Sequence, residues 1–156
     1  MNSGWNAAPT SAVPVRYFDD VTDEDELPTV AFHLPIYRLV VAAGANRDFN
    51  SIHHNAEYAR ATGAPDMYVN ALFLLGMWER SIRDWIGDAG TIRSISGFRM
   101  SRFTTVGETA LILARVNGKR IDNGIGVVTV DIRTEDSSGV TAGPGTVEVT
   151  LPRRGK

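Results

Sequence analysis

Residues 68–87, YVNALFLLGMWERSIRDWIG, decide the fold that we expect for this chain. The first half of this run is apolar on every side of a helix, which is typical of a helix enclosed by protein. Charges enter only from Glu79 onward, where we expect the helix to emerge. With Pro65-Asp66 before it and Gly87 at its end, the run predicts a central helix of about 19 residues, roughly 28 Å long.

Three shorter segments precede the central helix. Residues 30–34 are apolar and branched, which predicts a strand. Residues 37–45 are compatible with a short helix ended by Gly44. Residues 55–62 predict a second short helix, because Asn55 is a favourable N-cap residue.

The part of the chain after the central helix is predicted to be β structure. Apolar residues alternate or run together between turn-forming residues, in four predicted strands at 92–100, 109–120, 125–135 and 146–151. The short connections between them predict an antiparallel meander. One strand before the helices and four after them indicate an α+β protein of the hot-dog fold, with an antiparallel sheet wrapped around a long central helix.

Composition limits the classes of function. A chain of 156 residues fits one domain, and we predict a flexible N-terminal arm at residues 1–17 and a single domain at residues 18–152. The absence of cysteine excludes disulfides and thiolate metal sites within the chain and fits a reducing compartment. A net charge of -2 argues against binding of nucleic acid. We see no secretory signal and no apolar stretch long enough for a membrane span, and therefore expect a cytoplasmic protein.

The segment DFNSIH, residues 48–53, carries the strongest chemical signal. It places the carboxylate of Asp48 and the imidazole of His53 five positions apart, with a turn-forming Asn-Ser pair between them. An acid and a base on a loop beside an apolar helix suggest acid/base chemistry on an apolar substrate. A role in a turn or a helix cap is the structural alternative for Asp48.

Other kinds of site have less support. His53, His54 and Glu57 are the only metal-ligand candidates in this region, and their spacing matches no common zinc motif, so no metal site is expected. Neighbouring side chains diverge, so at most one of the two histidines should face a given cleft. Nucleophilic catalysis is also disfavoured, because the chain has no cysteine and no Gly-x-Ser-x-Gly motif.

A family resemblance becomes specific at this motif. Residues 48–59, DFNSIHHNAEYA, resemble the signature of MaoC-like, (R)-specific enoyl-CoA hydratases, in which Asp-x-Asn-Pro-Ile-His precedes a short helix. Residues 68–72 fall where that family carries His-Gly-Met at the start of its central helix. The resemblance covers roughly residues 18–151. Residues 46–49, 52–54, 67–70 and 83–87 are most similar in style to the small subunit of actinobacterial steroid side-chain enoyl-CoA hydratases.

The chain departs from the family pattern at three places. Arg47 replaces the glycine usual before the aspartate, and Ser51 replaces the proline. Asn70-Ala71 stands in place of His-Gly. The aspartate and the histidine are both retained.

The resemblance implies hydration of trans-2-enoyl-CoA thioesters to 3-hydroxyacyl-CoA, or the reverse dehydration. The acyl groups that it suggests include steroid and other bulky groups. It implies that Asp48 and His53 share the base and acid roles around one water molecule, with Asn50 supporting the site. A backbone N–H near Asn70 or Ala71 would meet the thioester oxygen. No cofactor is expected beyond the coenzyme A of the substrate.

Several residues are candidates for contact with such a substrate. Those that could line the acyl site, with the plain core as the alternative, are Phe49, Tyr68, Phe73 and Trp78. Those that could meet the phosphates of coenzyme A, although arginines are common at strand ends, are Arg93, Arg99 and Arg102.

Two alternatives to a hydratase remain open at this stage. One is a hot-dog acyl-CoA thioesterase, and the other is a non-catalytic subunit that completes the acyl tunnel of a partner. In each case we expect a homodimer or a heteromer with a second MaoC-like chain, because open sheet edges favour pairing.

Overall fold

The computed structural model describes residues 15–155. The α-helices are α1 (Ile36–Ala45), α2 (Ala56–Ala61) and α3 (Ala71–Ile86), and the 3-10 helices are η1 (Phe18–Asp20) and η2 (Ser51–His53). The strands are β1 (Val30–His33), β2 (Thr91–Ser96), β3 (Thr109–Asp122), β4 (Ile125–Asp136) and β5 (Gly139–Leu151).

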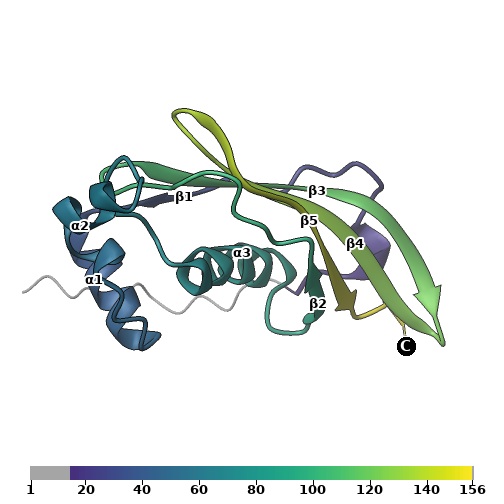
Figure 1. Cartoon of the computed structure of the whole chain (residues 1–156). Coiled ribbons are helices and arrows are strands. Elements are labelled where there is room, and N and C mark those ends of the chain that lie inside the picture. Colours follow the sequence, from purple (N-terminus) through teal and green to yellow (C-terminus); the bar gives the residue numbers. More distant parts are fainter. Residues whose placement is uncertain (1–14, 156) are drawn as a thin grey trace, which may run out of the picture.

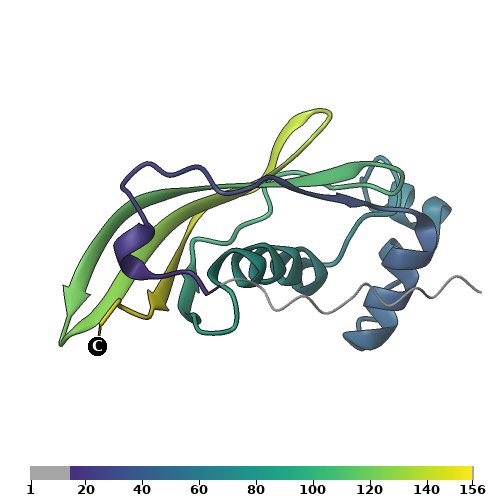
Figure 2. The same cartoon turned by 180° about the vertical axis from the view of Figure 1, so that it is seen from behind.

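The five strands form one antiparallel sheet in the order β1-β3-β4-β5-β2. The sheet curves over α3, while α1 and α2 lie at one end of it, beside the start of α3 (Figure 1). The view from behind shows the same layers, with η1 near the opposite end (Figure 2). The predicted antiparallel sheet around a long central helix is therefore confirmed.

The predicted four-strand meander is wrong for β2. This strand pairs with β5 at the far edge of the sheet, and only β3, β4 and β5 follow one another as neighbours. β2 ends at Ser96 because Gly97 turns the chain with a φ of 69°. Residues 97–108 then carry the chain across to β3, and Met100 makes only an isolated bridge to Ala142.

Two other strand and helix boundaries differ from the predictions. β5 begins at Gly139, well before residue 146, although its first half contains three glycines and a proline. α1 continues through Gly44, which lies within the helix and does not end it. Strand pairing in β5 and helical hydrogen bonds in α1 therefore outweigh the tendency of glycine to end a strand or a helix.

The central helix is shorter and less enclosed than predicted. Its 16 residues begin at Ala71, because the Asn70 side chain caps it, and Tyr68 lies before it in an isolated antiparallel bridge to Thr105. Val69 donates its N–H to the carbonyl oxygen of Thr104 over 3.1 Å. Leu72, in the half expected to be surrounded by protein, is 60% exposed.

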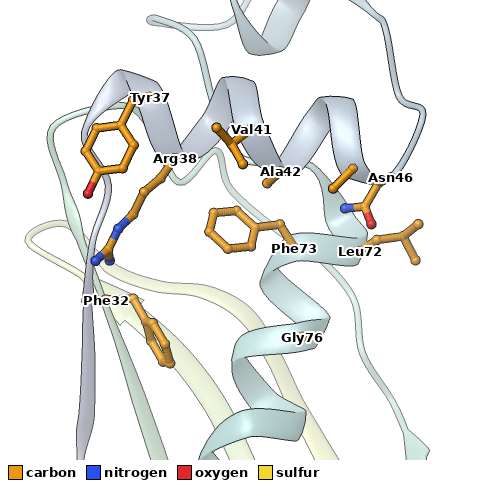
Figure 3. A pocket seen from close by; sticks show the side chains of 10 residues that line it. Phe32, Tyr37, Arg38, Val41, Ala42, Asn46, Leu72, Phe73 and Gly76 are labelled. Carbon is orange, nitrogen blue, oxygen red and sulfur yellow. The ribbon is translucent and has the colours of Figure 1, made fainter. Parts of the chain in front are cut away.

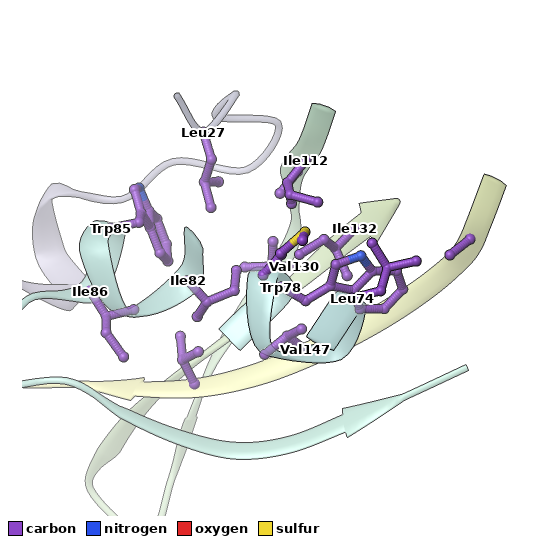
Figure 4. Packing of buried hydrophobic residues seen from close by; sticks show 14 of the residues in the cluster. Leu27, Leu74, Trp78, Ile82, Trp85, Ile86, Ile112, Val130, Ile132 and Val147 are labelled. Atoms are coloured by element: carbon purple, nitrogen blue, oxygen red, sulfur yellow. The ribbon is translucent and has the colours of Figure 1, made fainter. Parts of the chain in front are cut away.

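The core lies between the buried side of α3 and the concave face of the sheet (Figure 4). Trp78 is 0% exposed, and its Nε1–H donates a hydrogen bond of 2.7 Å to the Thr134 hydroxyl on β4. Its ring also meets Phe98 edge-on, with 5.0 Å between the centroids. A satisfied indole N–H lets this large side chain be buried without an unpaired donor.

The start of the described chain is tied to the far end of α3. Arg16, within the predicted arm, donates from Nε to the Trp85 carbonyl oxygen over 2.9 Å and lies over the Trp85 ring. Residues 1–14 of that arm lie outside the described residues. No helix described between residues 15 and 155 has the length and apolar character needed to cross a membrane.

The packing of Trp78 leaves no room for a side chain at Gly145. A Cβ at this position would lie 2.6 Å from the Ser96 carbonyl oxygen and 2.7 Å from the Trp78 ring. We expect Gly145→Ala to lower the free energy of unfolding by about 1–3 kcal/mol, as overpacking does. Urea denaturation measures the change.

Gly118→Ala is the matched control, because a Cβ there meets nothing within 4 Å. We expect it to change the free energy of unfolding by less than about 0.5 kcal/mol. Equal losses in the two variants would contradict a tight contact between α3 and β5.

Candidate functional site

Asp48 lies on the turn that leaves α1. The helix ends at Ala45 with Asn46 as its C-cap residue, and Arg47 adopts a left-handed conformation with a φ of 56°. Asp48 then donates its N–H to the Ala43 carbonyl oxygen over 2.9 Å, which anchors it to the end of α1. Its side chain is 38% exposed, so the carboxylate can be reached from outside.

His53 is placed by the short helix η2. Asn50 is the N-cap residue of η2, and its side-chain oxygen accepts the Ile52 N–H over 3.2 Å. Ser51 occupies the first helical position, which also suits proline. His53 is only 3% exposed, whereas His54 is exposed. Asn50 therefore orders the backbone that carries the imidazole.

Asp48 and His53 are in direct contact, and the second ring nitrogen of His53 is also engaged. Nε2 of His53 lies 3.0 Å from Oδ2 of Asp48, and Nδ1 lies 2.7 Å from the Tyr68 carbonyl oxygen. A carbonyl oxygen only accepts, so Nδ1 carries a hydrogen and Nε2 is the nitrogen that faces Asp48. A hydrogen bond between Nε2 and Oδ2 needs one proton between them, so the pair can both give and take a proton.

Tyr68 closes one side of this pair. Its ring meets the His53 ring edge-on, with 5.5 Å between the centroids, and lies 4.7 Å from the Phe103 ring. Burial, and then the charge of Asp48, raises the pKa of the Tyr68 phenol above its usual value. The phenol therefore stays protonated at neutral pH.

The start of α3 provides free N–H groups. The buried Asn70 side-chain oxygen accepts the Phe73 N–H over 2.8 Å, and its backbone oxygen accepts the Leu74 N–H over 3.2 Å. The bond from Leu74 is the first one within the helix, and Phe73 is capped by the side chain, so among the first three amides of α3 those of Ala71 and Leu72 remain free. These amides and the positive end of the helix dipole favour an oxygen that carries negative charge.

A pocket of about 570 Å³ opens between α1, the start of α3 and β1 (Figure 3). Its walls are mostly apolar, and the residues that line it are Phe32, Tyr37, Arg38, Val41, Ala42, Ala45, Asn46, Leu72, Phe73 and Gly76. Asn46 donates from Nδ2 to the Asn70 side-chain oxygen over 3.2 Å. The pocket therefore borders the start of α3, and its lining residue Asn46 lies two positions before Asp48 in the chain.

The predicted apolar contact residues have different positions. Phe73 lines the pocket, and Tyr68 borders the Asp48–His53 pair. Phe49 is 74% exposed on the surface next to Asp48. Trp78 is completely buried in the core and does not line the pocket.

The three predicted phosphate-contact arginines are also separated. Arg93 pairs with Asp122 over 3.3 Å at the β3–β4 turn, and this turn lies at the end of the sheet opposite α1 (Figure 1). Arg99 is exposed, and Arg102 donates to the Ser138 carbonyl oxygen. Arg102 also shares a smaller hollow with Tyr68 and Phe103, which makes it the arginine of the three that borders the site.

Sequence reasoning missed the contribution of α1 to the site. Tyr37, Arg38, Val41 and Asn46 all line the pocket, although α1 was expected only as a short helix. Their spacing along one helical side is a signal that could have been used. Across residues 15–155, no three His, Asp or Glu side chains gather closely enough to hold a metal ion.

Comparison with known proteins supplies independent information. No family model matches the chain. It is 33% identical over 113 residues to the 3-oxo-4,17-pregnadiene-20-carboxyl-CoA hydratase beta subunit of Mycobacterium tuberculosis, covering 72% of this chain and 83% of that protein.

Solved structures agree with this similarity. A chain of the ChsH1-ChsH2 complex from Mycobacterium tuberculosis superposes with a TM-score of 0.75 at 27% identity, over 84% of this chain and 98% of that chain. The (R)-hydratase PhaJ1 from Pseudomonas aeruginosa superposes with a TM-score of 0.78 at 16% identity, over 88% of this chain and 86% of that chain. The predicted hot-dog fold is confirmed.

The left-handed conformation of Arg47 generates a prediction about stability. A residue with a Cβ is disfavoured there by about 1–2 kcal/mol, whereas glycine adopts the conformation freely but loses more chain entropy on folding. We expect Arg47→Gly to raise the free energy of unfolding by up to about 1 kcal/mol, measured by urea denaturation.

Arg47→Ala is the control, because it removes the long side chain and keeps the Cβ. It should not reproduce the gain. A loss of stability in Arg47→Gly alone would show that glycine's added chain entropy outweighs the relief of backbone strain.

Proposed function

This chain belongs to the family of MaoC-like hydratases, and from that premise we propose that it hydrates trans-2-enoyl-CoA thioesters to 3-hydroxyacyl-CoA or catalyses the reverse dehydration. The observation that carries the proposal is the contact of 3.0 Å between Asp48 and His53, with the imidazole held by the Tyr68 carbonyl. Asn46, two residues before Asp48, lines the apolar pocket and bonds to Asn70 at the start of α3, where free amides are available.

Asp48 and His53 divide the proton transfers in the proposed reaction. Asp48 is the more exposed of the two, so its carboxylate takes a proton from water as the water oxygen bonds to C3. The π electrons of the double bond move to C2, which takes the proton that His53 holds at Nε2. A proton then passes from Asp48 to Nε2 and restores the pair, so water is the only co-substrate and no further cofactor is needed.

The thioester oxygen gains negative charge while C2 is being protonated. We assign its stabilisation to the amide of Ala71, with that of Leu72 beside it. Asn70 leaves these amides available because its side chain caps the next N–H, that of Phe73. The loss of one such donor typically lowers the rate about 10²–10³-fold.

The pocket supports a bulky acyl group as the substrate. Its volume of about 570 Å³ and its apolar walls suit a large hydrophobic group. The relative from Mycobacterium tuberculosis is described as acting on a pregnadiene-carboxyl-CoA, a steroid thioester. We include steroid side-chain thioesters among the proposed substrates of this chain.

We also propose that a second MaoC-like chain covers the open side of this site. Phe49 and Leu72 are 74% and 60% exposed beside the catalytic pair and the pocket. Large apolar side chains exposed together near a site commonly mark an interface. The relative is described as a beta subunit, and the ChsH1-ChsH2 structure is a complex.

The hydratase proposal is tested with Asp48→Asn and His53→Gln. We expect either change to lower the rate about 10²–10⁴-fold, because each removes one partner in proton transfer. The measurement is the loss of enoyl-thioester absorbance with crotonyl-CoA and with a steroid enoyl-CoA, and circular dichroism checks the fold.

His54→Gln is the matched control, since the neighbouring histidine is exposed. It should retain the wild-type rate. Unchanged rates in Asp48→Asn and His53→Gln would contradict the proposal, and release of free thiol in place of hydration would identify a thioesterase.

The assembly proposal is tested with Phe49→Asp. A carboxylate buried without a partner should weaken association at least about tenfold. Analytical ultracentrifugation of the chain, alone and mixed with a second MaoC-like chain, measures the effect. Val140→Asp, on a side chain that is 37% exposed at the start of β5, is the control and should leave association intact.

A further inference from the structure

Arg38 is unusual among the residues that line the pocket. Of the described residues that form its walls, only Arg38 carries a charge, and most of the others are aliphatic or aromatic. A cation beside apolar walls loses part of its hydration and is therefore stabilised by an oxygen acceptor. The placement of this charge is specific information about what the pocket binds.

The guanidinium of Arg38 has spare hydrogen-bonding capacity. Its Nη1 donates to the His33 carbonyl oxygen over 2.9 Å, which holds the side chain in place. Within residues 15–155, no carboxylate lies within ion-pair distance of it. A guanidinium has five N–H donors, so several remain for a ligand.

Arg38 lies at the end of the pocket away from the proposed reaction. Figure 3 shows its guanidinium beside the Tyr37 hydroxyl and above Phe32, whereas Asn46 and Leu72 lie at the opposite end. The helical rise from Arg38 to Asn46 is about 12 Å. Asn46 bonds to Asn70, so the second end adjoins the start of α3.

We propose that the pocket binds an acyl group with an oxygen acceptor, a ketone or a carboxylate, at its end far from the thioester. Arg38 and the Tyr37 hydroxyl donate hydrogen bonds to that oxygen, and the apolar walls hold the hydrocarbon between. The orientation of the acyl group rests on the proposed function, which places the thioester at the start of α3. The rise of about 12 Å along α1 between these two lining residues is close to the length of an extended ten-carbon chain or a fused ring system.

Binding of saturated CoA thioesters tests this proposal, because they cannot be hydrated. Isothermal titration of the full chain compares decanoyl-CoA with 9-oxodecanoyl-CoA and with sebacoyl-CoA, which carries a terminal carboxylate. We expect at least one oxygen-tipped thioester to bind about 10–100-fold more tightly than decanoyl-CoA, which corresponds to a hydrogen bond with a charged donor. The tighter of the two identifies a ketone or a carboxylate as the preferred acceptor.

Arg38→Met keeps the length of the side chain and removes its donors. It should reduce the preference to less than about threefold, which is the range of a residual packing difference. Arg80→Met removes the same charge from the exposed side of α3 and should leave the preference as in the wild type. Tyr37→Phe alters a side chain that is 60% exposed, so it should fold normally and lower the preference by a smaller factor.

Equal affinities for the three thioesters, or a preference that survives Arg38→Met, would overturn the inference. Hydration of crotonyl-CoA by the wild type gives a separate readout of the proposed function, since four carbons do not reach Arg38. Hydration of crotonyl-CoA with equal binding of the three saturated thioesters would count against the role of Arg38 alone. A preference for an oxygen-tipped thioester without hydration of crotonyl-CoA would count against the hydratase proposal alone.

Discussion

The contact between Trp78 and the sheet determines where α3 lies. Gly145 admits the indole ring because it has no Cβ, and Thr134 takes the indole N–H as a hydrogen-bond partner. With α3 fixed there, its first residues reach the end of the sheet where α1 leaves β1. Asn70 bonds to Asn46, so this packing contact on α3 also positions the start of the helix, the pocket and the loop that carries Asp48.

The sequence predicts the local parts of this fold well. Asn55 caps α2 as expected, with its side-chain oxygen 2.9 Å from the Tyr58 N–H, and the turn at Asn123-Gly124 joins β3 to β4. The neighbours of β2 could not be read in the same way, because strand pairing depends on residues about 50 positions away. The start of α3 was also hidden, since Tyr68 and Val69 are as apolar as the helix that follows.

In the site too, the local features could be predicted from the sequence and the tertiary contacts could not. The Asp48–His53 pair could be foreseen from its motif, but the partner of Nδ1 could not, because the Tyr68 carbonyl is a backbone group that any residue would supply. The pocket depends on the side of α1 that faces α3, and this is a consequence of tertiary packing. The same packing places Trp78 in the core and Arg93 at the far turn of the sheet.

The difference in exposure between the side chains of Asp48 and His53 has a consequence for isotope exchange in the proposed reaction. The side chain of His53 is 4% exposed and that of Asp48 is 38% exposed, so the imidazole exchanges its Nε2 proton with water chiefly through the carboxylate. In the dehydration direction of the proposed reaction, hydrogen taken from C2 passes to His53 first. A deuterium label taken from C2 would then sit on the buried His53 imidazole. Its return to the carbon atom would compete with its exchange into the solvent.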